Sequence, residues 1–283
     1  MPGFDRFPPL AMPDTAPNSA VIERTSEVDC ALDYRLDGPT DFLFQIHALD
    51  GMDQEVLRES LDIVPDLPHR VYADPTLNHR FLRLHAEPGE LTLRYRALVR
   101  RRIEPIEPDP AFVPIADLPD QVMHNLMPTR YCESDLLGRA AYKLFSHLAP
   151  GMAQVQAIVD WIHDNMDYQI GSSQNTTTAR DAYLQRAGVC RDFAHLGVTF
   201  CRALNIPARL VVGYAPFDEP PPDFHAVFEA YLGQRWILFD ATGMSPLDRL
   251  VRIASGRDAK DVAFATLFGP ATMTSMAPLI SPA

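Results

Sequence analysis

Apolar and polar residues alternate through much of the first half of the chain. The clearest run covers residues 91–97, Leu-Thr-Leu-Arg-Tyr-Arg-Ala, in which every second residue is apolar or aromatic. This period of two is typical of a strand with one buried face. Residues 41–46 and 71–72 have a similar strand-like composition. We therefore expect an all-β domain, most simply a sandwich, over residues 24–118.

Proline-rich segments lie on both sides of this β-domain. Residues 1–23 form a Pro-rich tail without periodicity, and five prolines fall between positions 105 and 119. Proline breaks both helices and central strands. The sequence thus predicts a tail (1–23), a β-domain (24–118), and a second domain over residues 119–283.

In the second domain the apolar period lengthens to that of a helix. Residues 152–165 carry apolar side chains three and four positions apart, and so do residues 191–204. Between them, Thr178-Ala179-Arg180-Asp181 resembles the capping box at the start of a shorter helix. The chain then continues as a strand over residues 208–214. Helices followed by strands favour an α+β domain.

A hairpin is predicted after that strand. Residues 225–232 and 235–240 are apolar, aromatic-rich runs separated by Gly233-Gln234, a loop that suits a type II′ turn. If Leu232 pairs with Arg235, His225 and Asp240 share one face as diagonal neighbours, with backbones about 7–8 Å apart. Their side chains can bridge this distance, so the register predicts a His–Asp pair.

Cys190 stands at the start of the predicted helix 191–204, directly after Gly188-Val189. Free N–H groups and the helix dipole favour an anion there, and a nearby imidazolium favours the thiolate further. Cys190 is the predicted nucleophile, His225 its base and proton donor, and Asp240 the group that orients the imidazole.

The backbone N–H of Cys190 is a natural half of an oxyanion hole. For its second donor the sequence offers Trp161, Gln174 and Asn175 as candidates. Tyr214 is a candidate for the wall of the cleft. Phe217 and Phe224 are further candidates for that wall.

These segments resemble a known family. Residues 188–196, Gly-Val-Cys-Arg-Asp-Phe-Ala-His-Leu, together with 201–209 and 256–263, are similar to the core of the bacterial transglutaminase-like cysteine peptidases. His225 and Asp240 fall where that family places its base and its carboxylate. The resemblance implies a papain-like transglutaminase core, in which the nucleophile helix packs on an antiparallel sheet.

Two positions depart from the family pattern. Val227 stands where the family usually has Trp, and Ala241 stands where it usually has Pro. Neither change removes a member of the Cys-His-Asp set, although either one alters the surroundings of the acyl site.

These observations predict a cysteine-dependent amide or peptide hydrolase that acts through an acyl-thioester. Three alternatives stay open: acyl transfer to an amine, as in a protein-glutamine transglutaminase; a catalytically silent peptide-binding module; and a metal site made of Cys190, His225 and Asp240. No cofactor is predicted, and the expected partner is a peptide or protein substrate.

Composition narrows the class further. The net charge of −12 and the pI near 5.1 argue against a nucleic-acid partner. Four scattered cysteines form neither a disulfide framework nor a zinc pair. The first residues lack a signal-peptide pattern, and no segment has the apolar length of a membrane span. We expect a cytoplasmic protein that does not bind a membrane.

Overall fold

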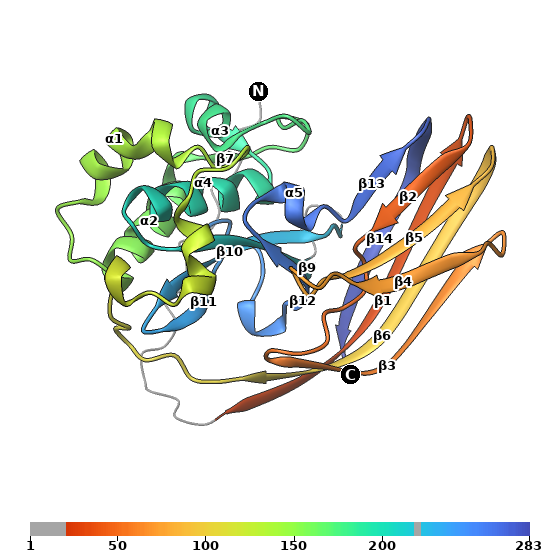
Figure 1. The fold of residues 1–283 in the computed structure, drawn as a ribbon, viewed down its shortest axis with the longest axis horizontal. Helices are drawn as coiled ribbons and strands as arrows, with labels where there is room; N and C mark the ends of the chain where they lie inside the picture. Colours follow the sequence, from red (N-terminus) through yellow and green to blue (C-terminus); the bar gives the residue numbers. More distant parts are fainter. Residues whose placement is uncertain (1–20, 218–221) are drawn as a thin grey trace, which may run out of the picture.

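The computed structural model describes residues 21–217 and 222–283 (Figure 1). Most of the predicted Pro-rich tail, residues 1–20, lies outside the described residues. A β-rich part and a mixed helix-and-sheet part lie side by side in Figure 1. The predicted α+β class with an N-terminal β-domain is confirmed.

The β-domain is a sandwich of two antiparallel four-stranded sheets, with strand orders β14-β1-β6-β3 and β13-β2-β5-β4. Its strands are β1 (Ile22–Leu36), β2 (Thr40–Phe44), β3 (Gln54–Val64), β4 (His69–Ala73), β5 (Arg80–Ala86), β6 (Gly89–Ile103), β13 (Ala265–Phe268) and β14 (Ala271–Pro282). Alternate residues of β6 are buried, as its apolar pattern predicts. The Tyr34 ring lies 5.4 Å from that of Phe42 across the two sheets, so the inner faces share one core.

The C-terminal boundary of the second domain needs correction. The sequence assigned all of 119–283 to it, but β14 pairs with β1 and β13 pairs with β2 in the sandwich. These pairings join residues more than 200 positions apart, and no local pattern reveals them. The last strands therefore tie the end of the chain to the β-domain.

The second domain contains five helices among its described residues, together with a four-stranded sheet of order β11-β10-β9-β12. The helices are α1 (Ser134–Phe145), α2 (Met152–Asn165), α3 (Ala179–Gln185), α4 (Cys190–Ala203) and α5 (Ala259–Val262). The strands are β7 (Asp167–Tyr168), β8 (Ala187–Gly188), β9 (Ala208–Tyr214), β10 (His225–Leu232), β11 (Arg235–Phe239) and β12 (Val251–Gly256). Short 3₁₀ turns cover η1 (Ile115–Asp117), η2 (Asp120–Leu126) and η3 (Leu247–Arg249). No helix in the described segments is long and apolar enough to cross a membrane.

The predicted hairpin register is confirmed, because Leu232 pairs with Arg235 and Phe228 with Phe239. The predicted turn type is wrong. Both Gly233 (φ 55°) and Gln234 (φ 62°) have positive φ, which defines a type I′ turn rather than type II′. The two turns have the same loop length, so the register is unaffected.

Helix α4 packs directly on the sheet at β10 because Gly197 lets the two elements approach. A Cβ atom at Gly197 would lie 2.5 Å from Cε1 of Phe228, a fully buried ring. The close contact sets the distance between α4 and β10. It therefore also sets the distance between Cys190, in the first turn of α4, and the strand that begins at His225.

We expect Gly197→Ala to lower the free energy of unfolding by about 1–3 kcal/mol, the usual cost of an overpacked core. Gly138→Ala is the matched control, since Gly138 lies in α1 and a Cβ atom there would have no neighbour within 4 Å. Alanine favours a helix over glycine by about 1 kcal/mol, so this control should be neutral or stabilising. Urea unfolding of both variants measures the difference; equal stabilities would contradict the contact.

Buried polar contacts join the two domains. The Tyr214 hydroxyl donates to the carbonyl oxygen of Ile46. The side-chain amide of Gln54 donates to the carbonyl oxygen of Arg252 at 2.8 Å and accepts from its N–H at 2.9 Å. Because these groups are buried, breaking the interface would leave them without partners. The β-domain thus supports the sheet that carries His225.

Candidate active site

Gly188 and Asp192, on either side of Cys190, determine the conformation of the chain at the start of α4. The Asp192 carboxylate accepts a hydrogen bond of 2.9 Å from the backbone N–H of Val189, as the third residue of a helix does in a capping box. A Cβ at Gly188 would lie 2.7 Å from Cβ of Asp192. Glycine at 188 and aspartate at 192 therefore set the direction from which the chain enters the helix and place Cys190 at its N-terminus.

His225 and Asp240 form a buried pair at the edge of the sheet. His225 Nε2 lies 2.8 Å from Asp240 Oδ2. The other carboxylate oxygen of Asp240 accepts from the backbone N–H of Thr242 at 2.9 Å and from its hydroxyl at 2.7 Å. Every carboxylate oxygen thus has a donor, so Asp240 is held in place and orients the imidazole ring.

Charge and burial act against each other in this pair. Burial lowers the pKa of His225, but the negative charge of Asp240 and hydrogen bonds with Asp240 and Cys190 raise it to about 10. Burial raises the pKa of Asp240, yet the charge of His225 and the hydrogen bonds from His225 and Thr242 hold it below its usual value. The pair is therefore an imidazolium and a carboxylate at neutral pH.

The structure brings Cys190 to this pair. His225 has Asp240 on Nε2, and it lies close enough to the Cys190 side chain for the two groups to interact electrostatically. The sulfur atom of Cys190 lies 3.9 Å from the carbonyl oxygen of Phe224, the residue before His225. Cys190 is 9% exposed. The imidazole of His225 thus lies in space between the thiol of Cys190 and the carboxylate of Asp240.

Trp161 does not lie near the thiol. Its ring lies 5.7 Å from those of Tyr183 and Phe200, and the guanidinium of Arg186 lies 4.5 Å from it. Phe200 is ten residues beyond Cys190, or about 15 Å along α4. The structure thus places Trp161 beside this later turn of α4, and within the described residues we find no hydrogen bond from it to Cys190.

Gln174 and Asn175 lie in the exposed loop before α3. The carbonyl oxygen of Gln174 accepts from Arg191 at 2.8 Å, and that of Asn175 accepts from the Tyr131 hydroxyl at 2.8 Å. These bonds use backbone atoms and fix the loop beside α4. In the described part of the chain we find no hydrogen bond from either side chain to Cys190.

The predicted cleft residues separate into two groups. Tyr214 is fully buried and its hydroxyl points to Ile46 in the β-domain, so it does not line an open cleft. Phe224 is also buried, stacked 4.7 Å from Phe264. The ring of Phe217 lies 5.5 Å from that of His225 and packs at an angle against the imidazole.

Sequence reasoning missed Tyr168. Its hydroxyl lies close enough to the backbone and the side chain of Cys190 for both to influence its pKa. The short strand β7 brings it there, because Tyr168 pairs with Gly188 in parallel with β8. A two-residue strand has no recognisable periodicity, so nothing in the sequence pointed to this contact.

The C-terminal motif 256–263 holds α5 against α4. The backbone N–H of Ala259 donates to Nε2 of His195 at 3.1 Å, and the carboxylate of Asp258 accepts from the backbone N–H of Tyr131 at 3.2 Å. Tyr131 in turn stacks on the His195 ring at 5.4 Å. This part of the family pattern has a structural role: it packs against His195 and so supports helix α4, which carries Cys190.

A metal site is not indicated. Within residues 21–217 and 222–283, no group of three His, Cys, Asp or Glu side chains is arranged to hold a metal ion.

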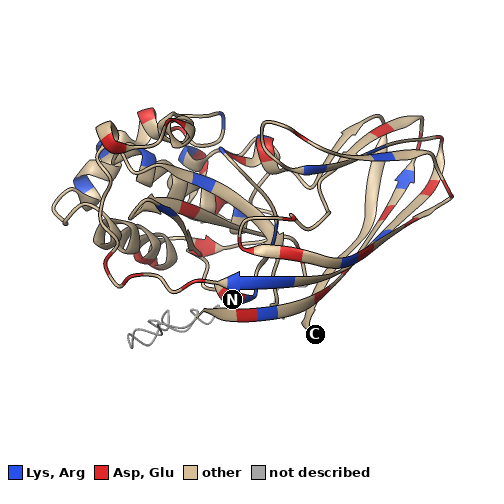
Figure 2. Ribbon diagram, turned by 60° about the horizontal axis from the view of Figure 1, so that its bottom comes forward, with Lys and Arg blue, Asp and Glu red and all other residues tan. Residues whose placement is uncertain are grey.

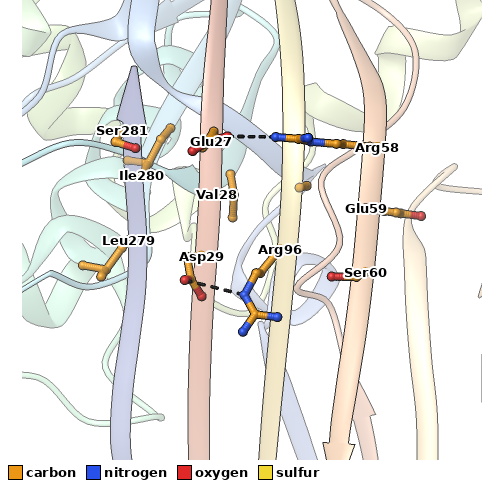
Figure 3. Close-up of a pocket in the computed structure, with 11 residues that line it drawn as sticks. Glu27, Val28, Asp29, Arg58, Glu59, Ser60, Arg96, Leu279, Ile280 and Ser281 are labelled. Atoms are coloured by element: carbon orange, nitrogen blue, oxygen red, sulfur yellow. Dashed lines mark hydrogen bonds and ion pairs between the residues drawn. The ribbon is translucent and has the colours of Figure 1, made fainter. Parts of the chain in front are cut away.

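A pocket lies on the outward face of the sheet β14-β1-β6-β3, and the residues that line it are distant in sequence from Cys190 (Figure 3). Its charges are largely paired, with Arg58 on Glu27 at 2.9 Å and Arg96 on Asp29 at 3.8 Å. Acidic and basic residues are interspersed in both domains (Figure 2).

The chain matches known protein families over most of its length. Residues 140–241 match the model of the transglutaminase-like superfamily, and residues 25–121 match the N-terminal domain of bacterial transglutaminases. The crystal structure of a "putative cysteine protease" from Cytophaga hutchinsonii is 41% identical, with a TM-score of 0.89 and 93% of each chain covered.

Two mycobacterial proteins of uncharacterised function are also similar. One, from Mycobacterium leprae, is 28% identical over 64% of this chain and 68% of that protein. The other, from Mycobacterium tuberculosis, is 28% identical over 46% of each, so the chain spans about half of that relative. The two family models and the Cytophaga structure show that the chain belongs to the transglutaminase-like superfamily and carries the N-terminal domain of bacterial transglutaminases.

Proposed function

We propose that this protein is a cysteine-dependent hydrolase of amide or peptide bonds that forms an acyl-thioester on Cys190. The observation that carries the proposal is the position of His225, which contacts both the Asp240 carboxylate and the Cys190 side chain. An imidazolium between a carboxylate and a thiol at a helix N-terminus is the arrangement that activates a sulfur nucleophile.

The chemistry proceeds in two steps. The Cys190 thiolate attacks the carbonyl carbon, a C–S bond forms, and the carbonyl electron pair moves to oxygen. His225 then donates its proton to the amide nitrogen as the C–N bond breaks, which releases an amine and leaves the thioester. In the second step neutral His225 accepts a proton from water, water adds to the thioester, and the acid leaves as the thiolate re-forms.

The same thioester serves hydrolysis and transfer to an amine. Water in the second step gives a carboxylic acid, whereas an amine gives a new amide. We propose water as the acceptor and a peptide or protein as the acyl donor. The protein is first acetylated on Cys190 with p-nitrophenyl acetate, and breakdown of this acetyl-enzyme is compared in buffer with and without a primary amine. Amide product in excess over acid would assign the protein to the acyltransferases.

The pH profile of alkylation tests the activated pair. Iodoacetamide should label Cys190 rapidly at pH 5–6 in the wild type, because His225 stays protonated up to a pKa of about 10 and stabilises the thiolate. In His225→Ala, fast labelling should appear only in alkaline buffer. Peptide mass spectrometry locates the label.

Cys132 and Cys201 are the internal controls for this experiment. Both are fully buried, and burial raises the pKa of the Cys132 thiol to about 12. They should stay unlabelled in the native protein. Slow labelling of Cys190 at pH 5–6 in the wild type, with the same profile in His225→Ala, would favour the silent binding module instead.

A further inference from the structure

The proposed mechanism still needs a second hydrogen-bond donor for the oxyanion that forms at Cys190. The tetrahedral intermediate carries a negative oxygen, and the backbone N–H of Cys190 supplies one donor to it. A second donor is usually present, and each is worth about 10²–10³-fold in kcat. The Trp161 ring packs against Phe200 in a later turn of α4, and Gln174 and Asn175 make their hydrogen bonds through backbone atoms.

The Tyr168 hydroxyl occupies the right neighbourhood. Tyr168 pairs with Gly188, two residues before Cys190, and its ring packs on Phe193 in the first turn of α4. Its hydroxyl lies close enough to the Cys190 backbone, which is the first donor, and to the Cys190 side chain, which is the attacking group, for both to influence its pKa. The oxygen of a carbonyl under attack by that sulfur must lie close to both. The hydroxyl therefore borders the position that the oxyanion will take.

The surroundings hold Tyr168 in this position. The backbone N–H of Asp167 donates to the carbonyl oxygen of Arg186 at 2.8 Å, and that of Gln169 donates to the carbonyl oxygen of Gly188 at 2.9 Å. These bonds clamp the strand on both sides of Tyr168. Its ring also packs against Phe193 of α4, with the ring centres 5.9 Å apart. A fixed donor is what oxyanion stabilisation requires.

The hydroxyl also keeps its proton. Burial and the nearby negative charges of Cys190 and Asp223 raise the pKa of Tyr168 above its usual value. It is therefore neutral through the working range of a thiolate enzyme and is able to donate.

We propose that Tyr168 is a catalytic residue whose hydroxyl donates the second hydrogen bond to the oxyanion formed at Cys190. This role rests on the proposed function of Cys190 as the nucleophile. In the free protein the hydroxyl lies near the Cys190 N–H. When an acyl group binds, its carbonyl oxygen accepts from that N–H, and the hydroxyl turns its proton to the same oxygen.

The test compares two reactions of the same sulfur atom in Tyr168→Phe. p-Nitrophenyl acetate acylates Cys190 through a tetrahedral oxyanion and releases p-nitrophenolate. Iodoacetamide alkylates it by displacement of iodide at a saturated carbon, with no oxyanion. We expect the variant to be acylated about 10²–10³-fold more slowly and to be alkylated at the wild-type rate.

Tyr183→Phe is the matched control. Tyr183 lies in the aromatic cluster around Phe200 and Trp161, where the ring centres are 5.9 and 5.7 Å away, and the change also removes one tyrosine hydroxyl. This variant should keep both rates. Thermal unfolding of the two variants should show native folding, which separates a lost donor from a damaged helix.

Some outcomes would contradict the role of Tyr168 and leave the role of Cys190 as nucleophile unaffected. Equal acylation rates in wild type and Tyr168→Phe, or faster acylation in the variant, would overturn the proposal, as would an equal loss in acylation and alkylation. Failure of the proposed function looks different: the wild type itself would then give no p-nitrophenolate burst, or Cys190→Ala would give the same burst.

Discussion

Replacing Cys190 with alanine is expected to abolish acyl transfer, with a loss of about 10⁵–10⁶-fold in turnover, as found when the nucleophile of a triad hydrolase is removed. The reason is chemical: without the sulfur atom no thioester forms, and the imidazolium of His225 has no thiolate beside it. The burst of p-nitrophenolate and the mass of the intact protein measure this directly. The wild type should gain one acetyl group, and the variant none.

Cys201→Ala is the matched control for this change. Cys201 lies on the same helix, is fully buried, and has a thiol whose pKa is raised by burial. It acts as a small core side chain, so its loss should cost some stability and leave the burst unchanged. A burst that survives in Cys190→Ala but disappears in Cys201→Ala would move the nucleophile away from the proposed position.

The parts of this site that could be predicted are those set by residues close together in the sequence. The meeting of His225 and Asp240 follows from one hairpin with a two-residue loop, and alternation along a strand sufficed to find it. Cys190 was recognisable from the helix pattern after Gly188. Both signals lie within about 15 residues of sequence, where periodicity is informative.

The misses have non-local causes. Tyr168 reaches Cys190 through pairing of β7 with β8, which lie on opposite sides of a loop and of α3. Strands β13 and β14 return to the sandwich from the far end of the chain. Trp161 of α2 packs against Phe200 of α4, a contact between two helices that no local pattern reveals. The expected cytoplasmic location stays a prediction.

The β-domain has a mechanical part in the site. Strand β9 pairs with β10, so that Gly213 faces His225, and the neighbouring Tyr214 is anchored to the β-domain through Ile46. The imidazole thus sits on a strand whose neighbour is held by the other domain. A catalytic group placed on a rigid element keeps its geometry during turnover, which gives a physical reason for the two-domain arrangement.

Asp240→Asn is expected to lower kcat by about 10⁴-fold, the effect of the equivalent change in a triad hydrolase. The amide of asparagine has no negative charge to support an imidazolium, and its NH₂ group can favour the wrong tautomer of His225. Asp181→Asn is the control: that carboxylate caps α3, so its loss should reduce stability but not kcat. Equal kcat in wild type and Asp240→Asn would remove Asp240 from the mechanism.

The same variant makes a prediction about stability and pH. The pKa of His225 is raised to about 10 in the folded protein, against an ordinary value near 6.5. Its pairing with Asp240 therefore stabilises the fold fully below about pH 6.5, and this contribution is lost as the pH rises through 10. The lowered pKa of Asp240 acts in the opposite sense, with a contribution that is lost as the pH falls below its ordinary range near 3.9.

Between these limits both charges favour folding. Urea unfolding at pH 5, 7 and 9 should therefore show the largest stability difference between wild type and Asp240→Asn at pH 5, and a smaller one at pH 9. A difference that grew toward pH 9 would mean that His225 is neutral in the folded protein. The imidazolium, and with it the proton that His225 is proposed to give to the leaving amine, would then be absent before the substrate binds.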